Sequence, residues 1–177
     1  MDMFAHSRRE HLSELERRNE LRRSLALPIG LAVLFGGGLY SLLSGFSWSE
    51  VNTITLHAVL FATVPAVVLW VSAVTFVIRS HVGYRYAYIP TAREIFDYKL
   101  KLEQFYSQTN KKDESDTDIQ AHLLKEYSDN AHHNNMNNNT KSARLHEANI
   151  RLVGVLLFLG LMAIISLIHP FAEIFYD

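Results

Sequence analysis

Residues 24–46 read SLALPIGLAVLFGGGLYSLLSGF, and this stretch decides the fold class because it holds no charged residue. Two further stretches are almost as free of charge, at residues 56–78 and 152–169. A helix of about 20 apolar residues spans the hydrocarbon core of a bilayer. None of the three shows the polar stripe that recurs every 3.6 residues in a helix at a water-exposed surface. We therefore predict an all-α integral membrane protein with three transmembrane helices.

The charged residues are concentrated in two blocks, at residues 1–23 and 79–151. The predicted organisation is a cytoplasmic amphipathic helix at 1–23, two transmembrane helices with a short external loop at 24–78, a helical cytoplasmic module at 79–151, and a third transmembrane helix with an external tail at 152–177.

The distribution of Lys and Arg predicts the orientation. Arginines precede the first span, follow the second and precede the third, whereas the loop SWSEVNTIT and the tail PFAEIFYD contain no Lys or Arg. Because basic residues concentrate on the cytoplasmic side, the N-terminus should be cytoplasmic and the C-terminus periplasmic. Tyr84, Tyr86 and Tyr88 are assigned to the inner aromatic belt.

The composition excludes several kinds of chemistry. The chain has no cysteine, which rules out disulfide frameworks and thiolate sites. The spans carry no Asp, Glu, Lys or Arg, whereas proton pumps and voltage sensors depend on such residues. Catalysis needs titratable groups that converge in a pocket, so we expect no enzyme, no cofactor and no metal. His132, His133 and His146 are interpreted as solvated surface residues.

The balanced charge of residues 79–151 gives no basic patch with interleaved aromatic residues, so nucleic-acid binding is not expected. A small anionic nucleotide is left open, since Arg85, Arg93 and Lys141 would offer it positive charge if they converged between subunits.

Two capping boxes predict helix starts in the charged blocks. Ser7 with Glu10 opens the N-terminal helix, and Thr91 with Glu94 opens a helix through about Ser107. The following segment, SQTNKKDESDTD, is polar and unpatterned and is predicted to be a loop. Asp118 would cap a further helix.

An apolar and polar stripe then continues without interruption into the third span. Its members are Tyr127, Ala131, Asn134, Asn138, Lys141, Leu145, Ala148 and Leu152, at alternating steps of four and three. This spacing predicts one long helix from about residue 118 through the third span. The alternative is a loop at 130–140, because the asparagine-rich sequence NAHHNNMNNNTK is typical of loops. In the long helix, Asn134, Asn138, Lys141 and Leu145 would form an oligomer seam, where a buried asparagine fixes register.

The string from Asn134 to Ala148, leading directly into a membrane span, resembles small bacterial membrane proteins of anti-phage defence loci, namely the SLATT-type two-span effectors and related effectors of cyclic-nucleotide defence. The resemblance covers about forty residues, and this chain differs by having a third span. It implies an effector of the bacterial inner membrane that permeabilises or depolarises this membrane when it is triggered.

Small residues mark one face of the first span. They are Ala26, Gly30, Gly37, Ser41 and Ser44, which we call the small-residue face. Small residues let helix backbones approach closely in lipid. The face is predicted either to pack within one chain, against Ala62, Ala66 and Ala73 of the second span, or to pack between copies and line a pore. Pro65, in the middle of the second span, is a candidate pivot.

Two functions remain open at this point. The first is an oligomeric inner-membrane effector that forms a pore or depolarises the membrane in anti-phage defence, with membrane lipid, copies of itself, and a soluble defence partner or nucleotide second messenger as its partners. The alternative is a non-conducting membrane anchor or adaptor that docks a soluble protein.

Overall fold

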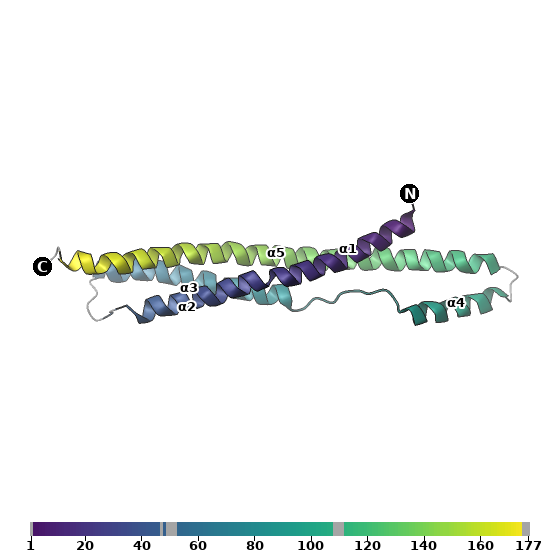
Figure 1. Cartoon of the computed structure of the whole chain (residues 1–177), viewed down its shortest axis with the longest axis horizontal. Coiled ribbons are helices and arrows are strands. Elements are labelled where there is room, and N and C mark those ends of the chain that lie inside the picture. The colour runs from purple at the N-terminus through teal and green to yellow at the C-terminus, as the bar shows by residue number, and fades with distance from the viewer. Residues whose placement is uncertain (1, 47, 49–52, 108–111, 175–177) are drawn as a thin grey trace. The chain divides into compact units, whose positions relative to one another are not determined.

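A computed structural model of the chain describes residues 2–46, 48, 53–107 and 112–174. These residues form α-helices and connecting segments without any strand (Figure 1). The helices are α1 (Met3–Ser24), α2 (Ala26–Ser44), α3 (Thr53–His81), α4 (Ala92–Ser107) and α5 (Lys112–Ile174). Three helical segments are long and apolar enough to cross a membrane, Met3–Ser44, Thr53–His81 and Glu114–Ile168. The prediction of an all-α chain with three spans is therefore confirmed.

The described residues divide into two compact units. The first, here called the module, comprises residues up to Leu21 and Tyr84–Thr140, and the second, the span unit, comprises Arg22–Gly83 and the chain from Lys141 onwards. Each unit has its own packing and is described by itself.

Within the span unit, the apolar side chains of α2, α3 and α5 form two clusters. Phe35 of α2 packs with Ala73, Leu152 and Val155 in one cluster, and Leu39 packs with Ala62, Ala66 and Met162 in the other. The three alanines of α3 are fully buried, because small side chains let the neighbouring helices lie close.

The break between α1 and α2 falls at Leu25, whose backbone keeps a helical conformation (φ −66°, ψ −25°). Pro28, in the first turn of α2, has no N–H to donate to the carbonyl oxygen four residues earlier. The first predicted span thus begins as a new helix segment just after the basic end of α1, where Arg22 and Arg23 lie in the last turn.

The start of α1 differs from the prediction. Asp2, not Ser7, caps the helix: its Oδ1 accepts hydrogen bonds from the N–H groups of Phe4 at 3.0 Å and Ala5 at 3.3 Å. Ser7 lies inside α1 and is buried. The capping box of Ser7 and Glu10 was therefore wrong, because a cap one turn earlier lets α1 include Ser7 as an interior residue.

The second capping box is confirmed. The Thr91 N–H donates to Glu94 Oε2 at 2.7 Å, and the Glu94 N–H donates to Thr91 Oγ1 at 3.3 Å. These bonds hold the pKa of Glu94 below its usual value. They satisfy backbone donors at the start of α4, whose predicted end at Ser107 is also correct.

The long helix predicted to run into the third span is present as α5, which extends over 63 residues and includes residues 130–140. It begins at Lys112, before the predicted cap at Asp118. The predicted loop is therefore wrong from residue 112 onwards, and residues 108–111 lie outside the described part of the chain. The absence of Gly and Pro between residues 115 and 153 is the local reason why this helix continues through its asparagines.

Candidate functional site

The asparagines of α5 supply backbone partners to residues 84–91, an extended segment between α3 and α4. Asn134 Oδ1 accepts the Ala87 N–H at 2.9 Å, and Asn134 Nδ2 donates to the Ala87 carbonyl oxygen at 2.9 Å. A side-chain amide carries one acceptor and one donor group, so it can pair with both polar groups of a single residue. The side chain of Asn134 is completely buried, and this pairing satisfies both of its ends.

Two more asparagines on the same face of α5 also donate hydrogen bonds to the backbone of this segment. Asn137 Nδ2 donates to the Arg85 carbonyl oxygen at 2.7 Å, and Asn130 Nδ2 donates to the Tyr88 carbonyl oxygen at 3.3 Å. The segment runs antiparallel to α5, since its residues 85, 87 and 88 pair in turn with Asn137, Asn134 and Asn130. Seven helical residues advance about 10 Å, and three extended residues also advance about 10 Å. This match explains why asparagines at steps of three and four can follow an extended chain.

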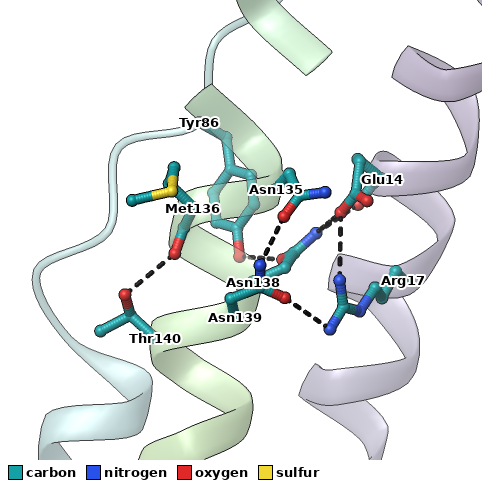
Figure 2. A network of polar contacts seen from close by, with 8 residues as sticks. All are labelled: Glu14, Arg17, Tyr86, Asn135, Met136, Asn138, Asn139 and Thr140. Atoms are coloured by element: carbon teal, nitrogen blue, oxygen red, sulfur yellow. Dashed lines mark hydrogen bonds and ion pairs between the residues drawn. The ribbon is translucent and has the colours of Figure 1, made fainter. Parts of the chain in front are cut away.

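Asn138 joins α1 to the same place (Figure 2). Its Nδ2 donates to the carbonyl oxygen of Glu14 at 2.7 Å and to Glu14 Oε2 at 2.8 Å. Its Oδ1 accepts the hydroxyl proton of Tyr86 at 2.7 Å. Asn138 is fully buried, so one amide connects α1, the extended segment and α5. These contacts, together with the Asn134 pairing, form what we call the asparagine network.

Two arginines of α1 complete the asparagine network. Arg17 Nη2 donates to Asn139 Oδ1 at 2.9 Å, and its Nη1 lies 3.7 Å from Glu14 Oε2 (Figure 2). The Arg18 guanidinium lies 4.7 Å from the ring centre of Tyr86 and 5.8 Å from that of Tyr88. It also donates to the Tyr88 hydroxyl. Planar guanidinium groups are suited to such stacking on aromatic faces.

Burial is the main influence on the Tyr86 hydroxyl and raises the pKa of Tyr86 above its usual value. The positive charge of Arg18 acts in the opposite direction. Tyr86 therefore remains a neutral donor to Asn138 at physiological pH. Tyr86 thus belongs to the asparagine network of the module, and its assignment to the inner aromatic belt stays a prediction.

The four residues of the predicted oligomer seam are buried in the single chain. Asn134 and Asn138 are fully buried, and Lys141 and Leu145 are 5% and 6% exposed. The asparagines were predicted to contact a second copy, whereas their partners are Ala87, Glu14 and Tyr86 of the same chain. For these two residues the seam is corrected to intrachain packing.

The small-residue face is exposed throughout. All five of its residues are exposed, namely Ala26, Gly30, Gly37, Ser41 and Ser44. A Cβ at Gly30 or Gly37 would have no atom within 4 Å. Packing of this face against the alanines of α3 was therefore a wrong prediction, and those alanines pack against other residues of α2 and α5.

Within α2, Gly36 is the glycine at the closest approach to a neighbouring helix. A Cβ there would lie 2.9 Å from Cζ2 of Trp70. The Trp70 ring is fixed by its Nε1, which donates to the Ala32 carbonyl oxygen at 2.7 Å. Pro65 lies within α3, which continues through it from Thr53 to His81; its role as a pivot stays a prediction.

His132, His133 and His146 are exposed, as predicted for surface histidines. His133 also contacts the segment before α4, since its Nε2 lies 2.7 Å from the Arg85 carbonyl oxygen. Among the described residues, no group of three or more His, Asp or Glu side chains is arranged to hold a metal ion.

No family model, curated protein or solved structure matches the chain. The asparagine network is thus known from its geometry alone. Sequence reasoning located its asparagines but missed Glu14, Arg18 and the extended segment. The available signal was the alternation of Tyr84, Tyr86 and Tyr88, since side chains two residues apart share one face of an extended chain.

Proposed function

We propose that the chain is a membrane effector whose asparagine network holds the spans in a resting state until a signal reaches the module. One observation supports this proposal above the others. The chain passes between the module and the span unit at three places, after residues 21, 83 and 140. Arg18, Tyr86 and Asn139, which belong to the asparagine network, lie within four residues of these passages.

A network with one member close to each of the three connections offers a direct route for control. Opening it would free the end of α1, the extended segment and the asparagine region of α5 together. Each of these leads along the chain into one of the spans. A soluble protein or an anionic nucleotide that competes for the same polar groups would supply the signal, since a ligand shifts an equilibrium by its differential affinity for two states.

The response that we propose is permeabilisation or depolarisation of the bacterial inner membrane by an oligomer, in anti-phage defence. The exposed small-residue face of α2 supports assembly of copies, because a helix with exposed glycines can approach another helix closely in lipid. The resemblance to defence effectors favours this setting.

Membrane potential in cells tests the proposal. The chain would be expressed as wild type and as Asn138→Asp, which places a carboxylate against Glu14. Wild type should leave the potential unchanged, whereas Asn138→Asp should depolarise the membrane without any signal. Met136→Gln is the matched control, since Met136 is an exposed residue of the same helix. Equal potentials in all three strains, with equal protein levels, would contradict the proposal.

Orientation is tested separately with topology reporters. We propose that the module lies in the cytoplasm. A reporter fused after residue 177 should report the periplasm, and one inserted near Lys112 should report the cytoplasm. The opposite pattern would reverse the proposed orientation.

The second candidate function is a non-conducting anchor that docks a soluble partner. The exposed apolar side chains of α4 favour it, since Phe96 is 58% and Phe105 60% exposed. Liposomes distinguish the two functions. The effector predicts ion flux through Asn138→Asp, whereas the anchor predicts none through any variant and a specific cross-link from position 96 to a second protein in cells.

A further inference from the structure

We propose that a groove between α2 and α3 binds an anionic phospholipid, with one acyl chain in the groove and the headgroup beside the basic end of the span unit. The groove has a volume of about 430 Å³. The lining residues that matter here are Ile29 and Val33 of α2 and Trp70, Val74, Ile78 and His81 of α3. This inference does not depend on the proposed function.

The indole ring of Trp70 explains why the two helices leave this space. The ring lies against the backbone of Gly36 on one side, and its Nε1 is bonded to the Ala32 carbonyl oxygen. It is therefore fixed between α2 and α3. Below it, towards His81, the lining consists of branched aliphatic side chains that are too short to fill the same space.

The lining favours an acyl chain over water. The accessible surface of the groove is entirely apolar, and water enters a cavity only where it finds two to four polar partners. The groove lies between α2 and α3, which belong to segments that are long and apolar enough to cross a membrane. Trp70 keeps its one polar atom bonded within the chain, so the ring offers only apolar surface to an occupant.

The charge of the span unit favours a negative headgroup. Its described residues contain six Lys and Arg but two acidic residues. Glu147 pairs with Arg151, and Glu173 belongs to the last turn of α5, at the far end of that helix from Lys141. Arg22 and Arg23 are exposed and precede Ile29 by about 10 Å of helix. His81 lies at the corresponding end of α3. The end of the groove that His81 lines therefore lies beside the basic end of the span unit.

These two features select one ligand. A free phosphate would satisfy the arginines but leave the groove empty, and a zwitterionic lipid would fill the groove but gain less from the arginines. A phospholipid with net negative charge satisfies both. Each arginine near an anionic headgroup contributes about fivefold to the binding constant.

Fluorescence quenching tests the proposal directly. In Trp48→Phe, Trp70 is the one remaining tryptophan. This full-length protein would be reconstituted with phosphatidylglycerol or phosphatidylcholine carrying the same brominated acyl chains, which quench indole on contact. Phosphatidylglycerol should quench Trp70 at no more than about one fifth of the mole fraction that phosphatidylcholine needs for the same quenching. Equal quenching by the two lipids would overturn the proposal and show bulk lipid only.

Variants identify the place of binding. Val74→Phe should fill the groove and remove the preference, whereas Val71→Phe, a matched change at an exposed position outside the groove, should retain it. The double variant Arg22→Gln, Arg23→Gln should bring the ratio of the mole fractions at which the two lipids quench towards one, while quenching by phosphatidylcholine stays the same. If neither lipid quenches and Val33→Cys cross-links two copies, a second copy occupies the groove and the proposal is wrong.

Discussion

Asn134 pairs with Ala87 as a neighbouring backbone would: its amide oxygen and nitrogen each lie 2.9 Å from their partner on Ala87. The extended segment therefore has a helix side chain where a strand would have another strand. An unpaired backbone group that is buried costs free energy comparable to a lost hydrogen bond. The asparagines of α5 remove this cost and fix where the segment lies on the helix.

We predict that Asn134→Asp releases the extended segment. The carboxylate loses the donor that faces the Ala87 carbonyl oxygen, and a buried polar group left without its partner costs about 1–3 kcal/mol. The open state should then be about 5- to 150-fold more populated. Tryptic cleavage after Arg85 measures this population, because proteolysis follows the open state when opening is fast.

Asn135→Asp is the control for this experiment. Asn135 is the residue after Asn134 in α5, and its Oδ1 accepts a hydrogen bond from Asn139 Nδ2 at 2.5 Å. A carboxylate keeps this acceptor, so cleavage should stay at the wild-type rate. A wild-type rate for Asn134→Asp as well would mean that the amide pairing does not hold the segment.

Arg18→Lys should weaken the docking of α1 more than Arg17→Lys does. Arg18 loses its stacking on Tyr86 and Tyr88, and cation–π contacts of this kind contribute about 0.5–1 kcal/mol at partly exposed sites. A lysine at position 17 can still donate to Asn139 and pair with Glu14. Unfolding midpoints of the module in urea compare the two, and equal losses would argue against the stacking.

His11 should make the docking of α1 pH-dependent. It is 2% exposed, its Nδ1 has no hydrogen-bond partner among the described residues, and its ring lies edge-on to Tyr127 of α5 at 5.8 Å. Burial lowers the pKa of His11 from the usual 6.5. The unfolded chain therefore binds more protons than the folded module between the folded pKa and 6.5, and stability rises with pH across this interval.

The expected result is that α1 loosens from α5 as the pH falls below 6.5, and that docking is complete above it. The distance between spin labels at positions 8 and 125 would report this change. His11→Phe should remove the pH dependence, whereas His6→Gln, which changes an exposed histidine of α1, should retain it. Retention of the pH dependence in His11→Phe would exclude this histidine as its source.

Much of the fold follows from local sequence. The three spans depend on composition within each segment, and the start of α4 depends on Thr91 and Glu94 alone, so both could be predicted. The long helix followed from the absence of Gly and Pro. The start of α1 was missed because Asp2 and Ser7 are both good caps, and the sequence does not rank them.

The partners of the candidate site could not be predicted in the same way. Periodicity placed Asn134 and Asn138 on one helix face, but their partners lie 47, 52 and 124 residues away in the chain. The residue pattern of a helix face also does not reveal which surface packs against that face. The small-residue face has the spacing of a packing surface, yet within one chain the neighbouring face of α2 is the one that contacts α3.

Gly36 and Gly37 should therefore respond differently to a larger side chain. A Cβ at Gly36 would meet Trp70 at 2.9 Å, and the bond from Trp70 to Ala32 restrains the ring from moving aside. Overpacking of this kind costs about 1–3 kcal/mol. Gly36→Leu should lower the unfolding midpoint of the spans in bicelles, whereas Gly37→Leu, which adds its side chain to open space, should leave the midpoint unchanged.

The same pair then tests assembly between copies. If the small-residue face joins copies, Gly37→Leu should reduce cross-linked oligomers while the fold of each chain stays intact. Leu34→Ile is the control, because Leu34 is an exposed residue of α2 whose volume is conserved. Loss of stability in Gly37→Leu would contradict the exposed position of this face. Full retention of oligomers would instead separate assembly from the glycines and leave Gly36, against Trp70, as the one of the two with a structural role.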